Sequence, residues 1–294
     1  MTDTVTDGLG REPGRMLAGL WPLAAILSVQ LSTALSRPVM AEIGVTGTVW
    51  LRLVWAGLFL AILSRPKILL YSRAQWAASI MLGLVTAGMT LAYFAAMNRM
   101  PIGLATSIDY LGPLAIAVGG LRRARDLLWT VLAVAGVACV LRTEGGWAAD
   151  PIGIACAGLS AIGWAGYIIL TKRVGRLFAG MEGLAIAIIV AAAALTVPAV
   201  AATPIWTAHA VAETAGLAVL APLATFSLEM VALRRMAMRT FGILMSVEPA
   251  VSALIGYLVL DELLEAQQIA GILFVTIASI GAVTEERRQP AGPS

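Results

Sequence analysis

The sequence predicts an all-α integral membrane protein with ten transmembrane helices, arranged as two inverted repeats of five helices each. Three observations lead to this prediction: an apolar composition, an internal repeat and a one-sided distribution of basic residues. Sixty per cent of the 294 residues are hydrophobic and 13 per cent are charged, whereas a soluble domain has roughly 45–50 and 25 per cent. Spans of about 20 residues, the length that crosses a bilayer, use almost the whole chain.

The predicted spans follow one another with short polar connections. They are 18–35, 44–63, 76–97, 101–120, 127–142, 151–171, 181–201, 213–233, 240–260 and 266–283. The first five make one repeat, residues 18–142, and the last five make the second, residues 151–283. Tails of residues 1–17 and 284–294 remain outside. A signal peptide at 18–35 is an alternative, because Arg15 precedes a short apolar run, but it leaves nine spans and breaks the repeat.

An internal repeat relates the two halves. When the chain is shifted by 136 residues, Arg99 falls on Arg235 and Pro113 falls on Pro249 without a gap. Five spans per half mean that the second half enters the membrane from the opposite side. Inverted repeats of this kind are typical of transporters, in which two similar halves exchange conformations around a central site.

Basic residues collect in alternate connections, which predicts the orientation of the chain. Sixteen of the twenty Lys and Arg residues lie on one side: Arg11, Arg15, Arg65, Lys67, Arg73, Arg122, Arg123, Arg125, Lys172, Arg173, Arg176, Arg234, Arg235, Arg239, Arg287 and Arg288. Three lie on the other side, Arg37, Arg99 and Arg142, and Arg52 lies within a span. Both termini are therefore predicted to be cytoplasmic. The net charge of +3 reflects this orientation rather than nucleic-acid binding.

The sequence contains no common enzyme, cofactor or metal signature. It lacks H-E-x-x-H, G-x-S-x-G and P-loop motifs. Cys139 and Cys156 lie in apolar runs, and His209 is the only histidine, which argues against a disulfide or a histidine-rich metal site. We expect no cofactor and no ATP-driven step within this chain, so transport would use an ion gradient or the gradient of the substrate.

Four ionisable residues lie within or near the predicted spans: Arg52, Asp109, Glu229 and Glu248. A charge there costs at least ~2.5–3.5 kcal/mol on insertion scales, so it persists only where it is paired, hydrated or used. Arg52, Asp109 and Glu248 are each the ninth residue of their span, which places them at similar depth. An arginine for a carboxylate and acids for an ammonium group or a proton would form a site for a zwitterion.

Structural interpretations of the same residues remain open. Arg52 and Asp109 are also compatible with an ion pair that holds two spans together. Glu229 lies near the cytoplasmic end of its span, where snorkelling or gating explains it as well as binding. Pro113 and Pro249 are expected to kink their helices, either to open a binding site or only for packing.

Aromatic residues in the spans are further candidates for the cavity wall, although aromatics more often serve packing or interface anchoring. They are Tyr93, Tyr110, Trp164 and Tyr167. Tyr93 is the repeat partner of Glu229. The outer-loop acids Asp261, Glu262 and Glu265 are expected to be solvated.

Several segments resemble EamA-type carriers of the drug/metabolite transporter superfamily, nearest the branch that exports threonine and homoserine from bacteria. They are SLEMVALRRMAMRTFGILMSVEPAVSALIGYLVLDE at 227–262, SIDYLGPLAIAV at 107–118 and WLRLVWAGLFL at 50–60. The resemblance implies ten helices in two inverted EamA repeats. It also implies a cavity with Tyr93, Asp109, Trp164, Glu229 and Glu248 in or near it. Asp109 stands where the family pattern has a glutamate.

The expected function is therefore export of threonine, homoserine or related zwitterions across the bacterial inner membrane by alternating access, coupled to protons. Arg52, Tyr93, Asp109, Trp164, Glu229 and Glu248 are the expected substrate-binding residues, and Asp109 and Glu248 the expected proton carriers. The lipid bilayer and the small substrate are the expected partners, and the sequence does not indicate an oligomeric state. Alternatives are a broad exporter of drugs or hydrophobic amines, a non-transporting scaffold or sensor, and an importer.

Overall fold

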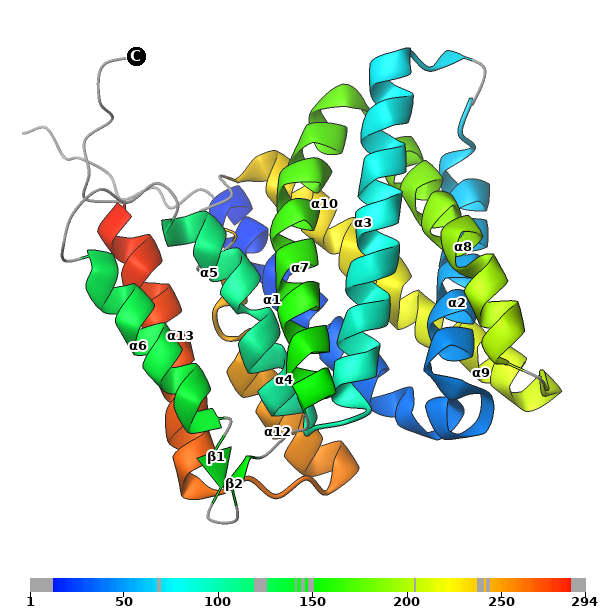
Figure 1. Ribbon diagram of the computed structural model, residues 1–294. Helices are drawn as coiled ribbons and strands as arrows, with labels where there is room; N and C mark the ends of the chain where they lie inside the picture. Colours follow the sequence, from blue (N-terminus) through cyan, green and yellow to red (C-terminus); the bar gives the residue numbers. More distant parts are fainter. Residues whose placement is uncertain are drawn as a thin grey trace, which may run out of the picture.

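A computed structural model describes residues 13–67, 70–118, 126–140, 142–143, 146–147, 151–203, 205–236, 241 and 244–286. Most helices cross the molecule from one end to the other, and short connections join them at the two ends (Figure 1). A small antiparallel hairpin, in which Arg142 pairs with Trp147, joins the two halves of the chain at the lower end. The all-helical prediction is confirmed, because this hairpin has only two residues per strand.

The described residues of the first half form six helices and the hairpin. They are α1 (Pro13–Leu35), α2 (Arg37–Ser64), α3 (Arg73–Met97), α4 (Ile102–Asp109), α5 (Leu111–Val118), α6 (Asp126–Val140), β1 (Arg142–Thr143) and β2 (Gly146–Trp147). The second half contains α7 (Pro151–Leu177), α8 (Glu182–Ala202), α9 (Ala208–Ala218), the π-helix η2 (Val219–Ala224), α10 (Thr225–Arg235), α12 (Glu248–Leu260) and α13 (Ala266–Glu286).

Five helical stretches in the described residues are long and apolar enough to cross a membrane. They are α2, α3, α7, α8 and the continuous stretch from α9 to α10, Ala208–Arg235. Shorter apolar helices occupy the other predicted spans, at Leu20–Leu35, Ile102–Ile116, Val131–Val140, Glu248–Leu260 and Ala266–Ala278. Large apolar side chains such as Ile62, Ile162 and Val197 point outwards. An apolar exterior around buried charged residues is typical of a multi-pass membrane protein.

Four of the described helices pack closely against one another. α3 lies against both α7 and α8, and α2 lies against α8. α6 and α13 form a separate pair at one side (Figure 1). Gly136 and Gly271 permit that pair to approach, because a Cβ on Gly136 would lie 2.8 Å from the carbonyl oxygen of Gly271. Small residues are the usual means of close helix packing in membranes.

The helix ends follow the local sequence. Ser72 begins α3 with a capping box, in which Ser72 and Gln75 each bind the other's backbone N–H. Thr207 caps α9 by accepting the N–H of Ala210. Arg65 caps the C-terminus of α2, because its left-handed backbone lets its N–H bond to the carbonyl of Ala61.

The helices are interrupted next to the two prolines at which the sequence predicts kinks. α4 ends at Asp109 and α5 begins at Leu111, so that Pro113 is the third residue of α5. Pro249 is the second residue of α12. Both prolines therefore lie in the first turn after an interruption. Helical bonding continues across the first interruption, because the Tyr110 N–H donates to the carbonyl of Thr106.

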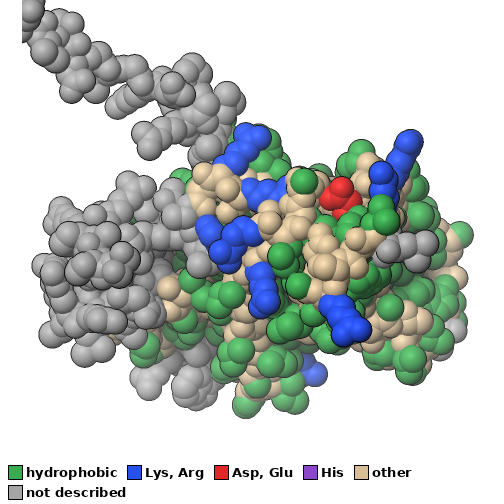
Figure 2. Space-filling model, turned by 90° about the horizontal axis from the view of Figure 1, so that it is seen from above, with side chains coloured by type: hydrophobic (Ala, Val, Ile, Leu, Met, Phe, Trp, Pro, Cys, Tyr) green, Lys and Arg blue, Asp and Glu red, His purple; other side chains and the backbone are tan. Residues whose placement is uncertain are grey.

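Basic side chains gather at one end of the bundle. Figure 2 looks onto the end where α2 finishes and α3 begins, and shows lysine and arginine side chains there. The described connections and helix ends of the predicted cytoplasmic side carry Arg65, Lys67, Arg73, Lys172, Arg173, Arg176, Arg234 and Arg235. The predicted cytoplasmic residues Arg11, Arg122, Arg123, Arg125, Arg239, Arg287 and Arg288 lie outside the described residues.

Candidate functional site

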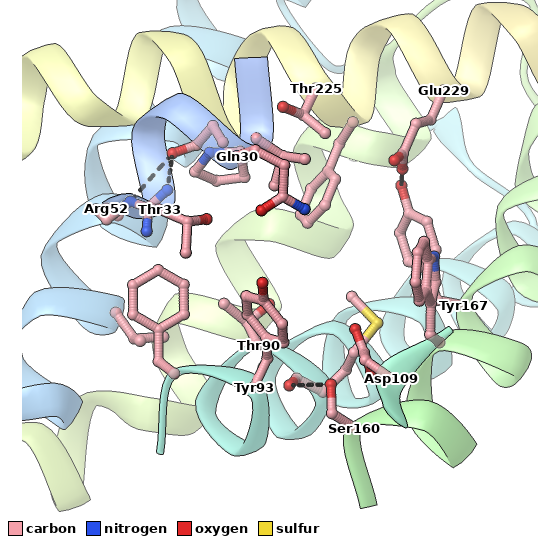
Figure 3. A pocket seen from close by; sticks show the side chains of 18 of the residues that line it. Gln30, Thr33, Arg52, Thr90, Tyr93, Asp109, Ser160, Tyr167, Thr225 and Glu229 are labelled. Carbon is pink, nitrogen blue, oxygen red and sulfur yellow. Dashed lines mark hydrogen bonds between the residues drawn. The ribbon is translucent and has the colours of Figure 1, made fainter. Parts of the chain in front are cut away.

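A cavity of about 80 Å³ lies between the two halves of the chain. Its walls come from α1, α2, α3, α4, α7, η2, α10 and α12 (Figure 3). The six residues that the sequence singles out as a binding site all line it: Arg52, Tyr93, Asp109, Trp164, Glu229 and Glu248. They come from six different helices, so the fold brings together residues that are up to 196 positions apart.

Three buried carboxyl groups face this cavity, and they occupy different positions in their helices. Asp109, Glu229 and Glu248 have exposed fractions of 7, 3 and 5 per cent. Asp109 is the last residue of α4, and Glu248 is the first residue of α12. The free N–H groups at a helix start stabilise a negative charge, whereas the carbonyls at a helix end do not. The backbone therefore offers a more favourable site for a carboxylate at Glu248 than at Asp109.

Glu248 links the two halves of the chain inside the cavity. Its Oε1 accepts a hydrogen bond of 2.9 Å from Nε2 of Gln30, a residue of α1. The second oxygen, Oε2, is buried and has no hydrogen-bond partner. The same holds for Oδ1 of Asp109. Buried acceptors are rarely left unpaired in proteins, so these two oxygens mark places where a bound donor would be stabilised.

Glu229 is held by an aromatic residue of the neighbouring helix. The hydroxyl of Tyr167 donates to Oε2 of Glu229 over 2.8 Å, and the Tyr167 ring packs on Phe226 with centroids 5.2 Å apart. Trp164 contacts Tyr110 edge to face, with ring centroids 5.8 Å apart. Tyr110 supports the wall from behind, because it is buried and does not line the cavity.

Tyr93 belongs to a chain of hydroxyl groups that crosses between the halves. Its hydroxyl lies 2.7 Å from that of Thr106, and the Thr106 hydroxyl lies 2.8 Å from that of Ser252 in α12. Thr106 also bonds to the carbonyl of Ile102. This network fixes the position of the Tyr93 ring at the cavity wall.

Arg52 contacts the break in the helix of the second half, where Ala221 has extended backbone angles. Its Nε and Nη2 donate to the carbonyl of Ala221 over 3.1 and 2.8 Å, and Nη2 also donates to Oγ of Ser32 over 2.8 Å. Its guanidinium lies 4.7 Å from the centroid of the Phe94 ring. Among the residues that the structure describes, Arg52 forms no ion pair with Asp109, so the structural pairing considered from the sequence is absent.

Five polar residues of the cavity wall are not identified from the sequence. Gln30, Thr33, Thr90, Ser160 and Thr225 line the cavity. They are uncharged, and the search for intramembrane charges passes over them. The available signal is Gln30 itself, since an amide within an apolar span must find a partner there.

The outer-loop acids do not all behave as expected. Asp261 and Glu265 are exposed, as predicted. Glu262 is not: its side chain is only 10 per cent exposed and lies 2.7 Å from Nη2 of Arg37. Its Oε2 accepts the backbone N–H of Ile102 over 2.9 Å. The prediction that Glu262 is solvated is wrong, because two groups from the first half of the chain cover it.

Comparison with known proteins gives a consistent result. The model of the EamA-like transporter family matches residues 151–284. The threonine/homoserine exporter RhtA of Salmonella typhimurium strain LT2 is 32 per cent identical over 271 residues, which cover 91 per cent of this chain and 92 per cent of that protein. The threonine/homoserine exporter RhtA of Escherichia coli K12 is 31 per cent identical and covers 91 per cent of each chain.

A solved crystal structure of another protein has the same fold. It superposes with a TM-score of 0.65 and 19 per cent identity, and the match covers 93 per cent of this chain and 98 per cent of that chain. The architecture described above is therefore shared by a protein whose structure is known from experiment.

Proposed function

Because this chain belongs to the family of EamA-type carriers, we propose that it exports threonine, homoserine or related small zwitterions by proton-coupled alternating access. Membership of a transporter family makes the chain a carrier and not an enzyme. The observation that carries the proposal is a cavity in which one arginine and three carboxyl groups meet from both halves of the chain.

The cavity residues supply the charges that a zwitterion requires. Glu248 and Asp109 each present an unpaired carboxyl oxygen, which suits a substrate ammonium group. Arg52 supplies the positive charge for the substrate carboxylate, and its bonds to Ala221 hold the guanidinium at the wall. Tyr93, Trp164 and Glu229 complete the wall.

Proton coupling follows from the same arrangement. A buried acid that is neutral without substrate becomes an anion when an ammonium group binds beside it, and the displaced proton then leaves. Asp109 and Glu248 are assigned this role because each lies at a helix break, where a change of backbone conformation alters the surroundings of the carboxyl group.

The architecture proposed for this cycle is two inverted five-helix repeats, residues 18–142 and 151–283, between cytoplasmic tails of residues 1–17 and 284–294. Five long and five shorter apolar helices supply ten membrane segments in this arrangement. The basic face of Figure 2 would lie in the cytoplasm of a bacterial inner membrane. Alternating access then exchanges the conformations of the two repeats around the cavity.

Efflux from preloaded cells tests the proposal. Cells with and without the protein are loaded with labelled threonine or homoserine, and loss of label is followed with and without a protonophore. We expect faster efflux in cells that contain the protein, and the protonophore should abolish the difference. Unchanged efflux with confirmed expression would contradict the amino-acid assignment. A parallel panel of cationic drugs then distinguishes a carrier of hydrophobic amines.

A further inference from the structure

Five threonine hydroxyls in the described helices bond to their own backbone. The residues that donate to the carbonyl four positions earlier are Thr48, Thr106, Thr196, Thr214 and Thr276. This local bond is the common solution for a hydroxyl in an apolar helix. The hydroxyl oxygens of Thr33 in α1 and Thr90 in α3 are also buried, yet they have no hydrogen-bond partner.

Both unpaired hydroxyls belong to the central cavity. Thr33 is completely buried, and Thr33 and Thr90 both line the cavity. Figure 3 shows Thr33 and Gln30 on one side of the cavity and Thr90 with Tyr93 and Asp109 on the opposite side. The carbonyl oxygen of Gln30, whose amide nitrogen binds Glu248, has no partner either. Unpaired neutral groups and unpaired carboxyl oxygens thus line the same cavity.

The charged groups and the neutral groups suit different parts of a ligand. Carboxyl oxygens and a guanidinium match the ammonium and carboxylate groups of any amino acid. A threonine hydroxyl both donates and accepts a hydrogen bond, so it matches a group that does the same. Apolar residues such as Val29, Val49 and Leu53 also line the cavity, and they would contact methyl and methylene groups.

We propose that Thr33 and Thr90 form a hydroxyl-recognition subsite, which makes the carrier select amino acids with a hydroxyl on the side chain over apolar amino acids of the same shape. This inference rests on the proposed function and deepens it. An apolar analogue leaves the two buried hydroxyls and the Gln30 carbonyl unpaired. A site built to bond a substrate hydroxyl therefore rejects the analogue that lacks it.

The lack of a partner alone does not make a subsite. Thr86 and Thr171 also have buried hydroxyl oxygens without a hydrogen-bond partner, but neither lines the cavity. Thr86 lies one turn from Thr90 in the same helix and is 1 per cent exposed. It is therefore a matched control, because replacing it removes an unpaired buried hydroxyl without touching the cavity.

The test compares the efflux of substrates that have equal shape and differ only in the hydroxyl group. Threonine is paired with valine, in which a methyl group replaces the hydroxyl, and homoserine is paired with norvaline. Efflux of each is measured from proteoliposomes or preloaded cells with the full-length protein. Wild type should prefer the hydroxylated member of each pair by at least about ten-fold. Thr33→Val and Thr90→Val should bring the ratio towards one, whereas Thr33→Ser and Thr86→Val should keep it.

The outcomes separate the subsite from the proposed function. A wild-type protein that moves none of the four amino acids contradicts the proposed function, and with it the subsite. A wild-type protein that moves threonine and valine equally overturns the subsite but leaves amino-acid export standing. The subsite is also overturned if Thr33→Val and Thr90→Val keep the wild-type ratio, or if Thr86→Val lowers it as much as they do.

Discussion

The amide nitrogen of Gln30 donates a hydrogen bond of 2.9 Å to Oε1 of Glu248, which joins α1 of the first half to α12 of the second half inside the cavity. Gln30 is 1 per cent exposed and Glu248 is 5 per cent exposed. The bond leaves the other carboxyl oxygen of Glu248 without a partner. A contact between the halves and a free acceptor for a ligand are thus combined in one side chain.

Glu248→Gln should reduce threonine efflux by about ten- to a hundred-fold, because an amide neither attracts an ammonium group nor carries a proton, and a bond to a charged group contributes about 1.5–3 kcal/mol. The dependence of efflux on pH should weaken in parallel. Efflux measured over a pH series checks both expectations. Glu265→Gln, a substitution of an exposed outer-loop acid, is the control and should behave as wild type. An unaltered efflux rate and pH profile in Glu248→Gln would contradict the role assigned to Glu248.

Arg52→Met should lower the free energy of unfolding by about 1–3 kcal/mol, since it leaves the buried carbonyl of Ala221 unpaired. Arg52→Lys should lose less, because an ammonium group replaces one of the two bonds. Thermal unfolding of the purified protein in detergent measures the effect. Arg173→Met serves as the control, as Arg173 is exposed on α7. Equal unfolding temperatures for Arg52→Met and wild type would show that the bonds to Ala221 do not hold the break.

Much of the fold and of the cavity wall is visible in the sequence for a physical reason. A charge in an apolar segment is costly, so Arg52, Asp109 and Glu248 are easily recognised in the sequence. In the structure these three residues line one cavity. Apolar runs likewise identify the helices. Pro113 and Pro249 lie next to the interruptions that precede α5 and α12.

Other parts of the site depend on contacts that the sequence does not encode locally. Gln30, Thr33 and Thr90 differ from other polar residues of the spans only in what lies opposite them in the folded bundle. Glu262 resembles its exposed neighbours Asp261 and Glu265, and only the packing of the first half decides that it is covered. Contacts between the two halves of the chain depend on the tertiary structure and are not predicted from the local sequence.

Glu262 should make stability depend on pH. Burial raises the pKa of its carboxyl group above the ordinary value, against the lowering effects of the Ile102 N–H and of Arg37. The folded protein therefore holds this proton more tightly than the unfolded chain. The stabilisation is complete below the unfolded pKa of about 4.3 and is lost as the pH rises through the folded pKa.

Glu262→Gln should remove this contribution. As the pH rises above about 4.3, the unfolding temperature of the wild type should fall more steeply than that of the variant, because the amide has no proton to lose. Unfolding temperatures across this range provide the measurement, and their difference isolates Glu262 from the other acids. Glu265→Gln should keep the wild-type slope. Parallel curves for wild type and Glu262→Gln would contradict the expectation.

Gly83 and Gly88 in α3 offer a matched test of the packing between α3 and α8. A Cβ on Gly83 would clash with the carbonyl oxygen of Ala187 and lie 2.8 Å from Cβ of Val190, whereas a Cβ on Gly88 would meet nothing within 4 Å. Gly83→Ala should therefore cost about 1–3 kcal/mol through overpacking. Gly88→Ala should change stability by less than about 0.5 kcal/mol.

Thermal unfolding in detergent compares the two variants under the same conditions, and efflux reports whether the cavity survives. Gly83→Ala should also slow efflux, because α3 carries Thr90 and Tyr93 of the cavity wall and the added methyl group pushes this helix away from α8. If both variants unfold at the wild-type temperature, α3 and α8 do not approach each other closely at Gly83. If only Gly83→Ala is destabilised, the glycine is required by the backbone of α8, which lies directly opposite.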